Sequence, residues 1–476
     1  MKYNNLGAGS IYDKPESSAT QWSLMSYLAR INYSLYDRYL FSVNGRVDGS
    51  SRFGGNNKYG FFPSGSVAWR ISEEGFMEPV KAVINNLKLR TSYGFTGNTE
   101  IGVYESLATL GSNSWTIGNQ LVSGFYPNRI PNPDLKWEKT GQFDIGFDLG
   151  LFNNRLRLTA DYYYKKTTDL LYNVAIPSAS GYDSMLKNIG SVQNKGYELS
   201  IESDNLSGAF SWTTAFNISF NRNKVLELGG ETYKDVGTYD DHLKTSDIRR
   251  LIVGQPIGVF YGYRFDGIFQ NEAECAQQTS SPSPIGVGLR RYKDLNGDGK
   301  IDATNDREIL GDANPKFFGG MTNTFAYKGF ELNVFLQYSY GNKIFNYNAM
   351  ELESPTGGQN VYQDLVNRWT PTNPSNEYQK ATTNRNNIVS DRFIEDGSFL
   401  KLKTVSLSYS FPKLNWKHIG GLRLYVTGQN LLTWTKYRGY DPEVSYRGAS
   451  TLEAGEDFGG YPQARTFMFG IKLDIK

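Results

Sequence analysis

The chain has 476 residues and a formal net charge of +2, because 50 Lys and Arg nearly balance 48 Asp and Glu. It therefore lacks the basic footprint of a nucleic-acid-binding protein, and we predict no nucleic-acid partner. A single cysteine excludes a disulfide framework, and only two histidines argue against a histidine-based metal site or catalytic triad. The mean hydropathy of −0.49 and the lack of an 18-residue apolar run exclude membrane-spanning helices.

Segments that alternate apolar and polar residues begin after the first 20 residues, which are polar and turn-rich. Side chains alternate across a strand with period two, so each such segment predicts a strand with one apolar face. About 13 strands follow in chain order: Trp22–Leu35, Arg38–Gly49, Phe61–Ser72, Leu87–Thr96, the two strands of the hairpin Gln142–Tyr164, Gly196–Glu202, Phe210–Asn221, the two strands of the hairpin Phe317–Tyr340, Phe399–Phe411, Leu422–Leu431 and Arg465–Lys476.

The hairpin Gln142–Tyr164 shows the pattern most clearly. Phe143 and Ile145 fall on one face of its first strand, whereas Asp144 and Asp148 fall on the other. A turn at Asn153 and Asn154 separates this strand from a second strand with the same alternation. The apolar face would pack against a protein core in a soluble sandwich or barrel, or against lipid in a membrane barrel with a wet lumen. This hairpin alone fits both alternatives.

The connections between the predicted strands alternate between shorter and long along the whole chain. Outer-membrane barrels have short periplasmic turns and long extracellular loops, whereas a soluble sandwich has no reason to segregate its loops in this way. We therefore predict an all-β fold: a transmembrane, antiparallel, up-and-down β-barrel in the outer membrane of a Gram-negative cell. The apolar parity shifts near Lys403 and Thr404, which predicts a β-bulge there.

The alternation also orients the chain. A short turn follows the first strand, so residues 1–20 would lie outside the cell and the C-terminus in the periplasm. Bacterial single-chain barrels have an even number of strands and an N-terminus that arrives through the periplasm. We therefore expect residues 1–476 to be the C-terminal portion of a larger barrel, or the product of a truncated gene.

Five segments stand out in order along nearly the whole chain: KYGFFPSGSVAWRISEE at 58–74, VGQPIGVFYGYRFDGIFQ at 253–270, DLNGDGKID at 294–302, GQNLLTW at 428–434 followed by GYDPE at 439–443, and the final strand 465–476. Together they resemble the SusC/RagA family of TonB-dependent outer-membrane transporters. The final Lys476 departs from the aromatic residue that usually ends such a barrel.

The resemblance implies a barrel of about 22 strands with an N-terminal plug and a TonB-contacting segment. Neither of these two parts is recognisable in this sequence. The implied activity is uptake of oligosaccharides, powered by the inner-membrane TonB complex, and peptides are the second choice of substrate. The implied partners are a SusD-like surface lipoprotein, the substrate and outer-membrane lipid. A passive porin or an adhesin is the alternative among membrane proteins, and a soluble carbohydrate-binding β protein is the alternative from another class.

One loop has the spacing of a calcium-binding loop. Asp, Asn and Asp occupy positions one, three and five, a glycine occupies position six, and position seven supplies a backbone carbonyl. An acid stands one residue late for position twelve, and no flanking helices are evident. The predicted ligands of a structural Ca²⁺ are Asp294, Asn296, Asp298, Lys300, Asp302 and Asp306. The alternative is an Asx-rich turn without an ion.

The polar faces of the predicted strands carry charges of both signs. These residues could line a substrate path, although pairing with one another is the simpler interpretation: Arg46, Asp48, Arg90, Asp144, Asp148, Arg157, Asp161, Glu198 and Glu202. Loop aromatics could stack on sugar rings or pack locally: Trp115, Tyr126, Trp369 and Trp434. The sequence contains no recognisable catalytic constellation, so we predict that the protein is not an enzyme.

Overall fold

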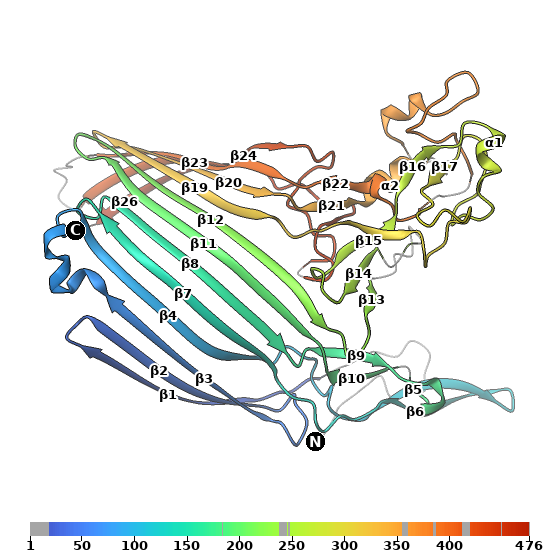
Figure 1. Ribbon diagram of the computed structural model, residues 1–476, viewed down its shortest axis with the longest axis horizontal. Helices are drawn as coiled ribbons and strands as arrows, with labels where there is room; N and C mark the ends of the chain where they lie inside the picture. The colour runs from blue at the N-terminus through green and yellow to red at the C-terminus, as the bar shows by residue number, and fades with distance from the viewer. Residues whose placement is uncertain are drawn as a thin grey trace.

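Thirteen strands form one antiparallel sheet, which we call the wall, and each strand pairs with the next sheet strand along the chain (Figure 1). The computed structural model describes residues 19–182, 184–237, 245, 248–354, 360–383, 387–411, 419–448 and 450–475. The sheet strands are β1 (Leu24–Leu35), β2 (Tyr39–Ser50), β3 (Tyr59–Arg70), β4 (Ile84–Asn98), β7 (Glu138–Leu151), β8 (Leu156–Thr168), β11 (Ser191–Leu206), β12 (Phe210–Glu227), β19 (Phe317–Tyr327), β20 (Phe330–Tyr340), β23 (Phe399–Ser410), β24 (Ile419–Thr435) and β26 (Thr466–Ile475).

The predicted strand number and order are confirmed, and the sheet is open, because β1 and β26 each have one partner among the described strands. The predicted bulge is also confirmed: the register of β23 shifts between Leu402 and Thr404 against both of its neighbours. Most of the segment 1–20, predicted as loop, lies outside the described residues, as does Lys476.

Some predicted boundaries were wrong. Residues Ile71–Glu73 form a 3₁₀ turn instead of the end of β3. The seventh strand of the wall, β11, is much longer than the predicted Gly196–Glu202. Apart from Val192 its first residues are polar and give no alternation, but they pair with both β8 and β12.

Short turns gather at one end of the sheet and long loops at the other (Figure 1). The tight turns use residues with positive φ, which are uncommon outside such turns. They include Tyr36–Asp37, Asn153–Asn154 and Lys328–Gly329. At Lys328–Gly329, a Cβ added to Gly329 would lie 2.6 Å from the carbonyl oxygen of Ser410, so the predicted turn requires this glycine.

The two faces of the sheet differ in chemistry. One row of paired residues on the outer face crosses eight strands and is almost entirely apolar or aromatic: Tyr33, Phe41, Val67, Thr91, Ile145, Tyr162, Tyr197 and Phe220. The adjacent row on the inner face is polar: Asn32, Ser42, Ser66, Ser92, Asp144, Tyr163, Gly196 and Asn221. Among the described residues many outer side chains are exposed, and Ile31 keeps 70% of its surface.

The long loops contain small sheets of their own. Their strands are β5 (Thr109–Ile117), β6 (Gln120–Arg129), β9 (Leu171–Ala175), β10 (Ser184–Asn188), β13 (Tyr233–Val236), β14 (Arg249–Ile252), β15 (Val259–Tyr263), β16 (Phe265–Ile268), β17 (Arg290–Tyr292), β18 (Arg307–Gly311), β21 (Lys343–Asn346), β22 (Ile394–Asp396) and β25 (Glu456–Asp457). The helices are α1 (Glu272–Cys275), α2 (Tyr347–Leu352) and the 3₁₀ turns Ile71–Glu73, Gly75–Val80, Ser178–Ser180, Gln363–Asn367 and Asp391–Phe393. None of the helices in the described part of the chain is long and apolar enough to cross a membrane.

The described parts of three long loops, 228–316, 341–398 and 436–465, pack around one shared core, and we call them together the loop cap. Their shared core contains Phe260, Phe345 and Phe393, each with essentially no exposed surface, and Phe458 packs against it. β21 pairs with β22 from its own loop and with β25 from the third loop. The loop cap therefore depends on contacts between residues up to about 200 positions apart.

Candidate functional site

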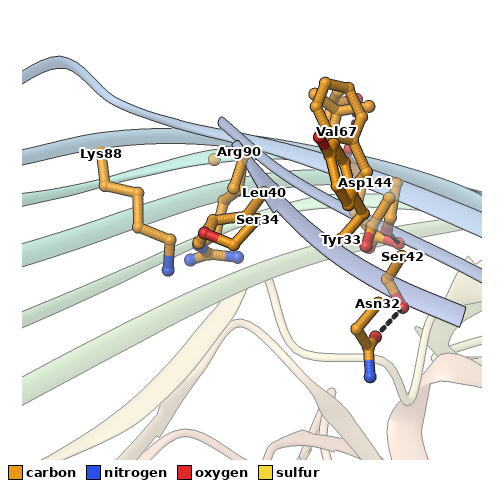
Figure 2. Close-up of a pocket in the computed structure, with 15 residues that line it drawn as sticks. Asn32, Tyr33, Ser34, Leu40, Ser42, Val67, Lys88, Arg90 and Asp144 are labelled. Atoms are coloured by element: carbon orange, nitrogen blue, oxygen red, sulfur yellow. Dashed lines mark hydrogen bonds between the residues drawn. The ribbon is translucent and has the colours of Figure 1, made fainter. Parts of the chain in front are cut away.

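The inner face of the sheet forms a hollow of about 540 Å³ near the short-turn end of the first strands. Asn32, Ser42, Lys88 and Arg90 point to this side, whereas Tyr33 points to the other (Figure 2). The hollow is lined by these polar and charged side chains together with apolar residues such as Leu40. The polar and charged side chains suit a water-filled lumen.

Ion pairs on this inner face run across neighbouring strands. Arg90 lies 2.7 Å from Asp161 and 3.4 Å from Asp148, and Lys88 lies 3.2 Å from Asp148. The residue between Arg90 and Asp161 in the register is Gly146. A Cβ at Gly146 would lie 2.1 Å from an Asp161 carboxylate oxygen, so the glycine leaves room for the ion pair.

The predicted pairing of the inner charges is observed for most of them. Arg46 lies 2.7 Å from Asp48, and Arg157 lies 3.0 Å from Glu202. The Asp144 carboxylate accepts hydrogen bonds from Ser92 and Gln142, and Glu198 lies opposite Asp161 in the register. Seven of the nine predicted charges therefore form ion pairs, as the simpler interpretation required, whereas Asp144 and Glu198 form none with the described residues.

The loop cap is held by buried charges as well as by its apolar core. The Glu353 carboxylate, 1% exposed, lies 2.7 Å from Arg392, 3.2 Å from Arg438 and 4.0 Å from Arg290. Each of these arginines comes from a different one of the three loops, so the carboxylate connects all three. Burial lowers the pKa of the Arg290 guanidinium.

A second buried contact ties the loop cap to the wall. The Lys401 ammonium on β23 lies 2.6 Å from both Asp441 and Glu443, and Lys403 lies 2.9 Å from Glu443. Lys401 is only 1% exposed. The segment 439–443, one of the five that carried the family resemblance, thus binds a loop to the inner wall.

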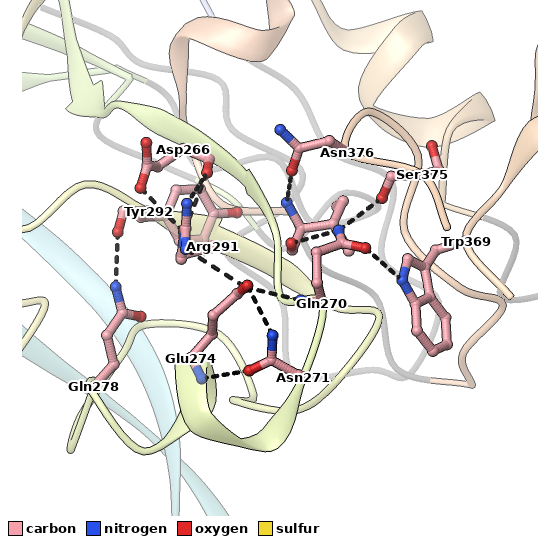
Figure 3. A network of polar contacts seen from close by, with 11 residues as sticks. Asp266, Gln270, Asn271, Glu274, Gln278, Arg291, Tyr292, Trp369, Ser375 and Asn376 are labelled. Atoms are coloured by element: carbon pink, nitrogen blue, oxygen red, sulfur yellow. Dashed lines mark hydrogen bonds and ion pairs between the residues drawn. The ribbon is translucent and has the colours of Figure 1, made fainter. Parts of the chain in front are cut away.

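Neutral hydrogen bonds complete the loop cap at its far end (Figure 3). Gln270 accepts a hydrogen bond from the Trp369 indole at 3.1 Å and donates one to the Ser375 carbonyl at 3.0 Å. Asn376 accepts one from the Ile268 amide at 2.9 Å. Trp369, a predicted sugar-stacking candidate, is therefore engaged in joining two loops.

The other candidate aromatics lie elsewhere. Trp115 and Tyr126 pack edge to face, 6.4 Å apart, on the β5–β6 hairpin. That hairpin projects away from the wall (Figure 1). Trp434, predicted to lie in a loop, is on β24 and is half exposed.

The predicted calcium ligands lie together in one loop, but their oxygens face the backbone. The two Asp294 carboxylate oxygens accept hydrogen bonds from the Gly297 and Gly299 amides, both at 2.7 Å. Asp302 accepts from residues 304 and 305, and both Asp306 oxygens accept from loop amides. The Asn296 side-chain oxygen accepts a hydrogen bond from the Asp298 amide, and the Asp298 carboxylate accepts one from the Lys300 amide. The backbone hydrogen bonds lower the pKa of Asp294.

Within the described residues, no three Asp, Glu, His or Cys side chains converge in a way that could hold a metal ion. The observed arrangement is that of an Asx-rich turn, and Ca²⁺ would have to reorient these carboxylates to obtain its six to eight oxygen ligands. The calcium site stays a prediction. Calorimetric titration of the protein with CaCl₂ tests it: a heat of binding that disappears in the Asp294→Asn variant would support the site, and the absence of heat would remove it.

An up-and-down antiparallel sheet with an apolar outer face, a charged inner face and loops segregated by length defines the wall of an outer-membrane β-barrel. Residues 2–431 match the family described as TonB dependent receptor-like, beta-barrel. The chain belongs to this family of TonB-dependent receptors. The predicted outer-membrane location is thereby confirmed, and the alternative of a soluble carbohydrate-binding protein is removed.

Individual relatives agree with the predicted SusC/RagA type. The chain is 41% identical to TonB-dependent receptor P3 of Formosa agariphila over 482 residues, which cover 99% of this chain and 48% of the relative. It is 32% identical to TonB-dependent receptor SusC of Bacteroides thetaiotaomicron, over 96% of this chain and 44% of that protein. The RagAB peptide transporter structure matches with a TM-score of 0.80 and 28% identity, covering 95% of this chain and 48% of that one.

The chain spans about half the length of the curated relatives it matches. The relatives are named as receptors and transporters, not as enzymes. In outer-membrane barrels the short turns face the periplasm and the long loops face the outside, so the loop cap lies on the extracellular side.

A charge on the outer face tests the membrane assignment. Replacing Val43 by arginine, near the middle of β2, is expected to destabilise the protein by about 2–4 kcal/mol, because the guanidinium would face hydrocarbon. The neighbouring Asn44→Arg variant places the same group on the inner face and is the matched control. Urea titration of both variants refolded into lipid vesicles measures the difference, and equal stability would contradict the assignment of faces.

Proposed function

We propose that this chain forms the C-terminal part of the wall and the extracellular loop cap of a TonB-dependent importer of the SusC/RagA type. Its substrates are oligosaccharides, which cross the outer membrane together with a SusD-like lipoprotein. The TonB complex would supply the energy through an N-terminal plug of the whole protein. The observation that carries the transporter type in this proposal is the fit to RagAB over 95% of the chain at a TM-score of 0.80.

The interlocked loop cap supports active import over passive diffusion. A passive pore needs an open mouth, whereas here three long loops share one core and are fastened to the inner wall by Lys401. Substrate would therefore be held at the extracellular side before it moves. Peptides are the second candidate class, because RagAB is described as a peptide transporter.

Uptake in the source cells tests the proposal. Cells with an in-frame deletion of the gene are compared with complemented cells, using fluorescent oligosaccharides and peptides with and without a protonophore. We expect oligosaccharide uptake to require both the gene and the proton gradient. Uptake that needs the gene but survives the protonophore would indicate a passive pore, and selective loss of peptide uptake would favour the second candidate.

A further inference from the structure

Two adjoining hollows lie beside β13, in the extracellular loop cap. One, of about 530 Å³, reaches from β13 to β9 and includes Tyr172 and Lys234. The other, of about 560 Å³, reaches over β14 and β15 to residues 303–307. Thr232 and Tyr233 line both, so the two hollows adjoin at β13, and we call them together the β13 groove. β13 lies between the two arms of the curved sheet at its long-loop end (Figure 1).

The floor of the β13 groove is aromatic and rigid. The Arg250 guanidinium lies 4.0 Å from the Tyr233 ring centroid and 3.9 Å from that of Tyr261, so it is held between the two rings. Tyr233 nevertheless keeps half of its surface exposed. A tyrosine fixed on one side and open on the other offers a flat apolar surface without a large entropy cost on binding.

Polar groups stand directly beside this surface. Asp235 accepts two hydrogen bonds from Arg250, at 2.6 and 2.9 Å, which fix the carboxylate in one plane. A carboxylate has about four lone-pair directions, so two acceptor positions remain after this pairing. The fixed Asp235 can therefore accept hydrogen bonds from a ligand.

The other end of the groove adds a donor. The Lys234 ammonium lies 3.8 Å from the Tyr172 ring centroid and 3.4 Å from the Asn173 carbonyl oxygen, and forms no ion pair with the described residues. The Tyr172 hydroxyl also lacks a hydrogen-bond partner within the part of the chain that the structure describes. Both groups retain hydrogen-bonding capacity for a molecule in the groove.

We propose that the β13 groove binds an oligosaccharide, with one pyranose ring stacked on Tyr233 and bonded through its hydroxyls to Asp235, and with a second sugar unit bonded to Lys234 in the adjoining hollow. A sugar ring presents an apolar C–H face next to hydroxyls that both donate and accept, which is the combination offered here. A few placed polar groups on an apolar surface are typical of ligand sites. The groove would serve as an external substrate site, and this inference rests on the proposed function.

Binding by the intact purified transporter in detergent tests the site. An array of neutral and uronic-acid oligosaccharides identifies the tightest ligand, and calorimetry then measures its Kd. Tyr233→Ala is expected to weaken binding at least tenfold, whereas Tyr233→Phe keeps the ring and should bind within about twofold. Tyr461→Ala, which removes a tyrosine that is 93% exposed elsewhere on the loop cap, is the matched control and should leave Kd unchanged.

A second variant tests the site independently in case Tyr233→Ala does not fold. Thr232→Trp fills the part shared by both hollows from an exposed position and should also abolish binding. Three results would each overturn the inference: no oligosaccharide of the array binds, the groove binds peptides in preference to oligosaccharides, or Tyr233→Ala leaves the Kd unchanged. If Tyr233→Ala binds unchanged while oligosaccharide uptake depends on the gene, only this site is removed. If oligosaccharide uptake does not depend on the gene, both the proposed function and this site are removed.

Discussion

Replacing Glu353 by glutamine is expected to destabilise the loop cap by about 3–5 kcal/mol while leaving the sheet folded. The substitution keeps the shape of the side chain but removes the negative charge that faces Arg392, Arg438 and Arg290. Removing one partner of a buried ion pair leaves uncompensated charge in a poorly hydrated interior, which is the reason for this large cost. Arg438 keeps a second partner, Glu395, at 2.8 Å, whereas Arg290 is buried.

Hydrogen–deuterium exchange measures this prediction locally. Amides of Tyr347–Leu352 in α2, which pack in the shared core, should lose most of their protection, because local unfolding sets their exchange. The matched control is Glu331→Gln, which breaks an inner-face pair with Arg423 whose side chains are 41–43% exposed. That change should cost at most about 1 kcal/mol. Equal protection in both variants would show that the buried network does not hold the loop cap.

The wall could be predicted because its information is local. In β7, the alternation of Phe143 and Ile145 with Asp144 assigns each side chain to a face without reference to other strands. Neighbours in the chain are also neighbours in the sheet, so strand order followed directly from the turns. Even the bulge near Lys403 was visible as a change of parity.

The loop cap could not be predicted, because its contacts are not local. Phe260 and Phe345 stand in short apolar runs that do not distinguish a loop strand from a turn or a helix, and Phe458 stands between an aspartate and a glycine. Likewise, nothing near Asp441 indicates that its partner is Lys401, 40 residues earlier. The family resemblance singled out residues 439–443 as a motif, but only the structure gave them a role. The β13 groove was missed for the same reason, since Tyr172 and Lys234 belong to different loops.

Replacing Lys401 by methionine is expected to release residues 437–448 from the inner wall at a cost of about 3 kcal/mol. Methionine has a similar length, but it leaves the Asp441 and Glu443 carboxylates without their shared cation. The cost lies at the lower end of the range for a broken buried pair, because Lys403 still lies 2.9 Å from Glu443. Trypsin added to whole cells should then cleave at Arg438 or Arg447 faster than in the parent protein.

A second substitution in the same variant separates charge from packing. Asp441→Asn in the Lys401→Met background removes the uncompensated carboxylate and should recover part of the lost stability, as expected for two residues that interact directly. Asp441→Asn alone should destabilise the loop. Purely additive effects of the two substitutions would contradict an ionic contact between them.

Acid should release the same loop in the parent protein. Burial favours the neutral forms of Asp441 and Glu443, but hydrogen bonds from Lys401 outweigh it and hold the pKa of each carboxyl below its ordinary value, 3.8 and 4.5 respectively. A lowered pKa in the folded state stabilises the contact fully above the ordinary values, and this stabilisation is lost as pH falls through the lowered ones. Exchange of the 437–448 amides, corrected for intrinsic rates, should therefore stay slow from pH 7 to about 5 and accelerate below about pH 4. In the Lys401→Met variant the hydrogen bonds from Lys401 are lost, whereas Lys403 still donates to Glu443 and backbone amides still donate to Asp441. The pKa of each carboxyl should therefore be lowered less than in the parent protein, and acid should accelerate the exchange less.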